Sequence, residues 1–195
     1  MGAEPCTQTT IESLRGLLRD SSVLQASQYF GAEAIKLDAA PPNHKLGQVL
    51  KTHIVMVLLS SPELRVVLKV HFDLAQVRDY RRAQGRRDED MSNKQLVDFM
   101  KELCNQMGGR VCRIFDAHGM CMGMSVPLCT RGIYEIYADY QTKLGATTKF
   151  GDFWGLEGSF NSLYCSCYVE TMSPEGLPDL QSTDEQSPEG ELDFL

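Results

Sequence analysis

Two apolar stretches joined by a short polar turn, between residues 52 and 72, constrain the fold more than any other feature. Residues 52–60 (THIVMVLLS) are typical of a buried strand, and Ser61-Pro62-Glu63 has the composition of a turn. From residue 64 the side chains alternate with a period of two, which is typical of a strand with one buried face. The inward positions are Leu64, Val66, Leu68, Val70 and Phe72. We therefore predict a β-hairpin.

Helical periodicity lies on both sides of this hairpin. Residues 10–20 predict an amphipathic helix, and helical signs continue to about residue 34, before Pro41 and Pro42 break the chain. Its apolar side carries Ile11, Leu14, Leu17 and Leu18. Residues 73–85 predict a short second helix that ends at a glycine.

A long helix is predicted from residue 92 to about residue 115, with its end near Gly119. Ser92 and Gln95 have the spacing of a capping box, in which each side chain accepts from the other residue's backbone N–H. The apolar periodicity runs straight through Gly108 and Gly109, so we expect the helix to continue through both. The apolar positions are Leu96, Met100, Leu103, Met107, Val111 and Ile114.

The remaining pattern favours strands at 120–127 and 132–140, with a final pair at 150–156 and 163–171. Helices and strands that follow one another in groups indicate an α+β fold, with an antiparallel sheet packed against a few helices. We expect residues 1–44 to pack as a helical segment on residues 45–172, in one domain. Residues 173–195 are predicted to form a flexible, acidic tail that contains proline.

Composition and charge narrow the class of protein. The tail carries seven acids, which account for the whole formal charge of −7 and leave residues 1–172 neutral. A neutral body with an acidic tail disfavours nucleic acid as a partner. The longest apolar run has six residues, far fewer than the roughly 20 that a membrane span needs, so we expect no membrane insertion. The N-terminus lacks the apolar stretch of a signal peptide, and we expect a cytoplasmic protein.

Seven cysteines without a CxxC pair indicate reduced thiols rather than a disulfide framework. The stretches GMCMGM (119–124) and CSC (165–167) would suit a soft metal such as copper. The alternation around Cys165 and Cys167, however, is that of small apolar side chains on the inner face of a strand. We therefore predict no metal site.

One face of the long helix carries an unusual set of polar residues. Asp98, Glu102 and Asn105 are spaced by four and then three positions, which places them on one stripe opposite the Leu and Met side chains. Gly109 continues the same stripe, where a missing side chain lets the backbone of a partner come near. Close packing against a neighbouring element is the alternative explanation for the glycines.

This set of residues resembles the signature of the CheC/CheX/FliY family of chemotaxis phosphatases. That family combines Asp or Ser with a Glu-x-x-Asn motif on a helix and a later proline, here Asp98, Glu102, Asn105 and Pro127. The 21 residues between Asn105 and Pro127 are one fewer than in the family's pattern. The resemblance covers about residues 45–170, and the single motif is similar to that of CheX-like members. It implies a CheX-like α+β fold and leaves room for a homodimer joined through the sheets.

The resemblance also implies a function and a partner. The expected reaction is hydrolysis of the aspartyl phosphate of a CheY-like response regulator in two-component signalling. Asn105 would position the attacking water, Glu102 would pair with a cation of the regulator, and Asp98 and Gly109 would contact this partner. The protein would need no cofactor of its own, because magnesium is expected to be carried by the phosphorylated regulator.

Two other functions remain open on the sequence alone. The same fold suits a non-catalytic interaction module that binds a receiver or a flagellar-switch-like protein. A cysteine-dependent or copper-dependent enzyme is the third hypothesis. Five arginines, followed at once by three acids (residues 88–90), predict either a self-compensating solvated loop or a docking patch for an acidic protein. These arginines are Arg78, Arg81, Arg82, Arg86 and Arg87.

Overall fold

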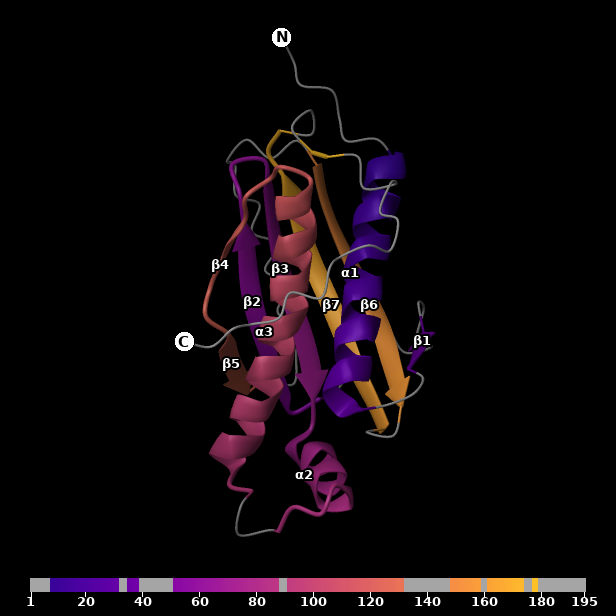
Figure 1. The fold of residues 1–195 in the computed structure, drawn as a ribbon, viewed down its shortest axis with the longest axis vertical. Coiled ribbons are helices and arrows are strands. Elements are labelled where there is room, and N and C mark those ends of the chain that lie inside the picture. The colour runs from indigo at the N-terminus through magenta and orange to yellow at the C-terminus, as the bar shows by residue number, and fades with distance from the viewer. Residues whose placement is uncertain are drawn as a thin grey trace.

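An antiparallel sheet with helices on one face forms the centre of the computed structural model (Figure 1). The model describes residues 8–31, 35–38, 51–87, 91–131, 148–158, 161–173 and 177–178. Within these ranges the strand order is β1-β6-β7-β3-β2-β4, and β5 also pairs with β2. The strands are β1 Lys36–Asp38, β2 His53–Ser60, β3 Leu64–Phe72, β4 Gly123–Met124, β5 Leu128–Arg131, β6 Thr148–Gly158 and β7 Asn161–Thr171. The helices are α1 Gln8–Phe30, α2 Leu74–Ala83 and α3 Asn93–Ala117. The predicted α+β fold is confirmed.

The predicted hairpin is formed by β2 and β3, which pair from His53 opposite Phe72 to Ser60 opposite Arg65. All five inward positions predicted on β3 are buried. The strands β6 and β7 form a second hairpin, and β7 pairs with β3. Cys165 and Cys167 lie fully buried on β7 beside these apolar side chains, as their alternation predicted.

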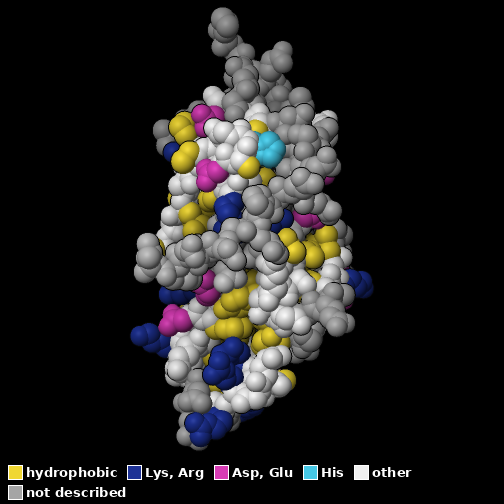
Figure 2. Space-filling model, in the orientation of Figure 1, with side chains coloured by type: hydrophobic (Ala, Val, Ile, Leu, Met, Phe, Trp, Pro, Cys, Tyr) yellow, Lys and Arg dark blue, Asp and Glu magenta, His cyan; other side chains and the backbone are white. Residues whose placement is uncertain are grey.

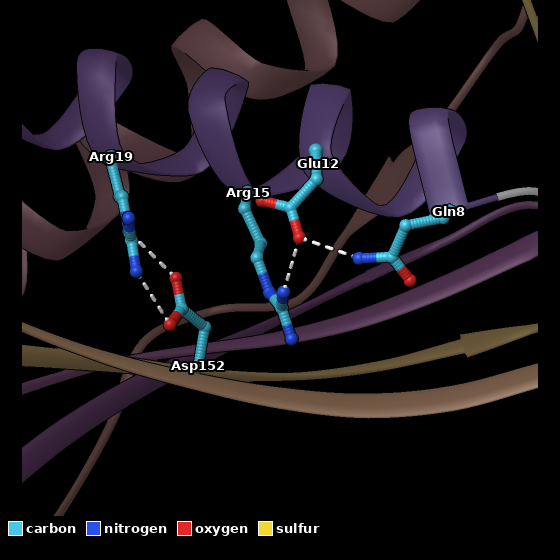
Figure 3. A network of polar contacts seen from close by, with 5 residues as sticks. All are labelled: Gln8, Glu12, Arg15, Arg19 and Asp152. Carbon is cyan, nitrogen blue, oxygen red and sulfur yellow. Dashed lines mark hydrogen bonds and ion pairs between the residues drawn. The ribbon is translucent and has the colours of Figure 1, made fainter. Parts of the chain in front are cut away.

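Helix α1 is one continuous helix and is longer than the amphipathic segment that the sequence indicated. Leu14, Leu18 and Phe30 belong to the core. Arg19 crosses to β6, where its Nε and Nη2 atoms each donate to a carboxylate oxygen of Asp152 at 2.8 Å (Figure 3). Such a two-point ion pair has a fixed geometry, and it therefore helps to set how α1 lies on the sheet.

Helix α3 lies beside α1 on the same face of the sheet (Figure 1). The predicted capping box is present, since the Ser92 and Gln95 side chains each accept from the backbone N–H of the other residue. The helix ends at Ala117, just before Gly119, whose positive φ of 82° suits a glycine. One predicted core position is corrected. Ile114 is only half-buried and Phe115 is fully buried, because a period of 3.6 places the next inward residue four positions after Val111.

Helix α2 lies beyond the sheet, near the start of α3 (Figure 1). Lys and Arg side chains are visible at this end of the molecule in Figure 2. Arg78 donates to Asn93 at 2.8 Å, Arg82 lies 3.3 Å from Asp79, and Arg81 stacks over the ring of Phe99. The three acids at 88–90 lie outside the described residues, so their compensation of these arginines stays a prediction.

Several expectations concern segments that are wholly or partly outside the described residues. The strand expected at 132–140 lies outside them, as does most of the tail that begins at residue 173. Leu177, within that predicted tail, packs against the core. Among the helices of the described residues, none combines the length and the apolar character that a membrane span requires.

Candidate functional site

The predicted polar stripe of α3 forms one wall of an open groove of about 390 Å³. The other wall is the segment that joins β4 to β5. The groove is lined by Asp98, Lys101, Glu102, Asn105, Met124, Ser125, Val126 and Pro127. The structure therefore brings together the four residues of the sequence motif, although they come from two separate elements. Asp98, Glu102 and Asn105 lie on α3, and Pro127 lies between β4 and β5.

The side chains of the stripe are available to a partner. Asp98 and Glu102 are exposed and Asn105 is half-buried. Glu102 accepts a hydrogen bond at 3.0 Å from Nε2 of Gln106, one turn further along the helix. In the described part of the chain, no cation forms an ion pair with Glu102, and the amide of Asn105 makes no hydrogen bond. Both groups are therefore free to bind an external molecule.

An aromatic cluster holds α3 in place behind the stripe. The Tyr29 hydroxyl of α1 donates to the backbone carbonyl of Phe99 at 2.7 Å, and the two ring centroids lie 4.6 Å apart. Burial raises the pKa of Tyr29, and the negative charge of Glu102 raises it further. The guanidinium of Arg81, on α2, also lies 4.6 Å from the centroid of the Phe99 ring. The helix that carries Glu102 and Asn105 is thus held at Phe99 by contacts from α1 and α2.

A β-bulge forms the opposite wall of the groove. Leu59 pairs with Met124 and Met56 pairs with Leu128, so two residues of β2 face the three residues 125–127. This one-residue insertion is a bulge, a feature that often lies beside functional sites. Proline is tolerated at such a position because it has no N–H to donate to a neighbouring strand.

Ser125 fixes the start of the bulge. Its backbone N–H donates to the Leu58 carbonyl at 2.9 Å, and its Oγ accepts from the Leu58 N–H at 3.0 Å. The sequence had predicted one strand over 120–127, and this prediction is wrong in extent. Two short strands are present instead, because the extra residue interrupts the ladder between them.

The two glycines of α3 have different surroundings. A Cβ atom on Gly108 would lie 3.0 Å from Sδ of Met124 and 3.1 Å from Cγ2 of Val57, so this glycine lets the helix approach the sheet and β4 closely. Among the described residues, a Cβ atom on Gly109 would meet only Nη1 of Arg113, at 3.6 Å. Gly109 does not line the groove, and its contact with a partner stays a prediction.

Comparison with known proteins identifies the fold. No family model matches the chain, and no curated protein matches it in sequence. A CheC-like superfamily protein from Shewanella sp. PV-4 superposes with a TM-score of 0.61 at 14% identity, over 81% of this chain and 97% of that one. The chemotaxis protein CheX from Vibrio vulnificus superposes with a TM-score of 0.55 at 12% identity, over 79% of this chain and 97% of that one. This chain has the CheC/CheX fold. A third structure with this fold, the CheX–CheY–BeF3–Mg²⁺ complex from Borrelia burgdorferi, has a TM-score of 0.55 at 11% identity, over 80% of this chain and 96% of that one.

One charged residue of the groove, Lys101, was not among the site residues predicted from the sequence. Lys101 is half-buried and lies three positions after Asp98 and four before Asn105. The same helical spacing that defined the stripe includes this position, so the signal was present in the sequence. Burial raises the pKa of the Cys129 thiol on β5, while the charge of Lys101 acts in the opposite direction. The groove therefore carries both signs of charge.

The cysteines among the described residues do not contribute a nucleophile to the groove. Cys104 lies between Glu102 and Asn105 in the sequence, but its side chain points into the core, where Sγ is 3.9 Å from the carbonyl oxygens of Val55 and Leu68. Burial raises the pKa of Cys104 to about 12. A buried thiol of this kind is unreactive. Among the described residues, no three His, Cys, Asp or Glu side chains are grouped so that they would hold a metal ion.

Proposed function

We propose that this protein binds the receiver domain of a CheY-like response regulator and accelerates hydrolysis of its aspartyl phosphate. The observation that carries this proposal is the juxtaposition of Glu102, Asn105 and Pro127 in one open groove. The fold is shared with chemotaxis CheX proteins, one of which was solved in complex with CheY, BeF3 and Mg²⁺. Together these observations favour a CheY-like partner seated over the groove.

The reaction requires positioning rather than a strong nucleophile. A water oxygen forms a bond to phosphorus while the bond from phosphorus to the aspartate oxygen breaks. The aspartate leaves as a carboxylate, and the water supplies the protons of the phosphate product. Positioning and electrostatic stabilisation dominate phosphoryl transfer, so an enzyme gains most by holding the water in line with the breaking bond.

An amide suits this task better than a carboxylate. The oxygen of Asn105 accepts a hydrogen bond from the water, and its NH₂ group donates to a phosphoryl oxygen, without a negative charge to repel the anion. The amide has no competing hydrogen bond within the described residues, and it projects from a helix that α1 and α2 hold at Phe99. A rigid support of this kind preserves the alignment that the reaction needs.

The neighbouring charges have separate tasks. Glu102 lies one turn before Asn105 and pairs with a cation of the regulator beside its phosphoryl group. Asp98 extends the acidic edge by a further turn and contacts the partner. Magnesium enters with the receiver, since the described residues of the groove offer the side-chain oxygens of Asp98, Glu102, Asn105 and Ser125 on an open, solvated surface rather than an enclosed metal cage.

An interaction module without catalysis is the second candidate, and exposed apolar side chains beside the groove favour it. Val126 is 76% exposed and Met124 is 40% exposed, as expected of a surface that binds a protein. The same experiment separates the two candidates. Each receiver domain of the same genome is phosphorylated and its phosphate release is followed with and without this protein. A phosphatase accelerates the release, whereas a binding module forms a complex and leaves the rate unchanged.

A charge variant on α3 sharpens this experiment. Glu102→Gln removes the proposed ion pair and is expected to weaken binding and slow phosphate release by about tenfold or more. Asp116→Asn makes the same change on an exposed residue near the end of the helix, outside the groove, and is expected to match the wild type. Equal effects of both variants would refute a specific role for Glu102.

A further inference from the structure

The exposed apolar side chains in and beside the bulge, Met124, Val126 and Leu128, lie on two different faces at the edge of the sheet. Met124 pairs with Leu59, whose side chain faces α3, and Sδ of Met124 lies against Gly108. Leu128 pairs with Met56, on the opposite face of the sheet. One inserted residue reverses the face to which every later side chain points, so the bulge separates Met124 and Val126 from Leu128. Of these three side chains, Met124 and Val126 line the groove with Asn105, and Leu128 does not.

Exposure of these side chains is unusual for this molecule. Among the described residues, the large apolar side chains classed as exposed are Leu24, Leu58, Met124, Val126 and Leu128. All but Leu24 lie on β2 or on the chain from β4 to β5, so apolar exposure is concentrated at one edge of the sheet. Of these side chains, Met124 and Val126 line the groove, and apolar exposure next to polar groups is typical of a surface that another protein covers.

The bulge presents this surface in a fixed conformation. Both hydrogen bonds between Ser125 and Leu58 anchor it to β2, and Pro127 fixes its own φ and restricts the backbone of Val126 before it. A surface that is already ordered loses little conformational entropy when it binds, which favours affinity. Since Pro127 has no N–H, this edge is poorly suited to pairing with an added strand, and contact through side chains is the better use of it.

We propose that Met124 and Val126 form the apolar half of the docking surface and select the receiver domain by packing against apolar side chains beside its phosphorylated aspartate. This inference rests on the proposed function, because it places the same partner over the same groove. The complementary partner has a cation that pairs with Glu102 and an anionic phosphoryl group near Lys101 and Asn105. Beside that phosphoryl group it has an apolar patch that packs against Met124 and Val126. Polar contacts orient the reaction, and the apolar contacts determine which receiver binds.

The test measures binding and turnover separately. The probes are the receiver domains of the same genome, each converted to its beryllofluoride adduct with Mg²⁺ for calorimetry, and to its phosphorylated form for kinetics. Val126→Asp is expected to raise Kd and KM by about tenfold or more, since it puts an unpaired charge where an apolar contact forms. Its kcat is expected to stay within about twofold, because the side chain does not touch the reacting atoms.

A matched control lies on the other face of the same edge. Leu128→Asp introduces the same charge at a residue of similar exposure, and it is expected to leave Kd and KM unchanged. Met124→Ser is a second test that adds no charge, and it is expected to weaken binding by several-fold. Thermal unfolding of each variant checks that the fold is intact. Val126 is so exposed that its replacement has little effect on stability.

The outcomes distinguish this inference from the proposed function. If Val126→Asp weakens binding while the wild type accelerates no hydrolysis, the docking surface stands and the phosphatase assignment fails. If the wild type accelerates hydrolysis and Val126→Asp binds equally well, the docking surface is wrong and the catalytic proposal survives. An equal loss of binding in Leu128→Asp, or no binding of any receiver adduct by the wild type, also overturns the docking surface.

Discussion

The contact between α3 and β4 predicts opposite effects for alanine at two adjacent glycines. Alanine in a helix interior is favoured over glycine by about 1 kcal/mol. At Gly109 the new methyl group meets only the Arg113 guanidinium, at an ordinary distance of 3.6 Å. We therefore expect Gly109→Ala to stabilise the protein by up to about 1 kcal/mol, close to the full helix propensity.

At Gly108 the same methyl group has no room. It would lie 3.1 Å from Cγ2 of Val57 and 3.2 Å from Cδ2 of Leu59, both on buried side chains of β2, and 3.0 Å from Sδ of Met124. The Met124 side chain can rotate away, but the two β2 side chains are enclosed by the core. Overpacking of a core costs about 1–3 kcal/mol. After the gain in helix propensity, Gly108→Ala is expected to be destabilising by about 1 kcal/mol.

Thermal unfolding of both variants measures the contrast. For a domain of this size 1 kcal/mol corresponds to about 2–4 °C, so the two melting temperatures should differ by about 4–8 °C, with Gly109→Ala the higher. Phosphate release by Gly108→Ala should also fall, since Met124 lines the groove. Two variants that are equally stabilised would refute the close approach of α3 to β4.

Two further predictions concern ion pairs away from the groove. A double-mutant cycle with Arg19→Ala and Asp152→Ala should give a coupling of about 1–3 kcal/mol in the free energy of unfolding, and additive effects would contradict the observed two-point contact. For Asp73, burial alone would raise the pKa, but the Thr52 backbone N–H and Lys51 outweigh it and lower the pKa below its ordinary value. Its contribution is therefore complete above about pH 4 and is lost as the pH falls through the folded-state pKa. Urea titrations of wild type and Asp73→Asn should converge at low pH, and a constant difference would refute this.

Local periodicity made much of the fold predictable. Alternation in residues 64–72 and 163–171 depends on which face of each strand is buried, so it appears in the sequence itself. The long helix was predictable for the same reason, and its capping box marked its start. The stripe Asp98, Glu102 and Asn105 followed directly from helical geometry.

The other wall of the groove was not predictable in this way. The bulge at 125–127 arises because β4 and β5 pair with β2 in registers that differ by one residue, and register depends on tertiary contacts. No local pattern separates Met124 from Leu128, although they face opposite sides of the sheet. The role of Gly108 was equally hidden, since it depends on the distance between α3 and β2.

One residue of the groove, Lys101, was predictable from the helical spacing of the sequence. Lys101 obeys the same helical spacing as its acidic neighbours, yet it was not included among the predicted site residues. Under the proposed function, the positive charge of Lys101 suits the anionic phosphoryl group of the partner, and the acids suit its cation. The homodimer stays a prediction, to be measured by analytical ultracentrifugation.

Single-turnover hydrolysis of a phosphorylated receiver by Asn105→Ala tests the central claim most directly. The wild type first identifies a receiver whose phosphate release it accelerates, and the variant is then compared with it at saturating concentration. Loss of a positioning group of this kind costs about 10²–10³-fold in rate, or about 3–4 kcal/mol in the barrier. We predict a loss of this size, with Kd for the beryllofluoride adduct within about threefold of the wild type, because Asn105 places water and contributes little to docking. A variant that retains the wild-type rate would contradict the assignment of Asn105 as the residue that positions the attacking water.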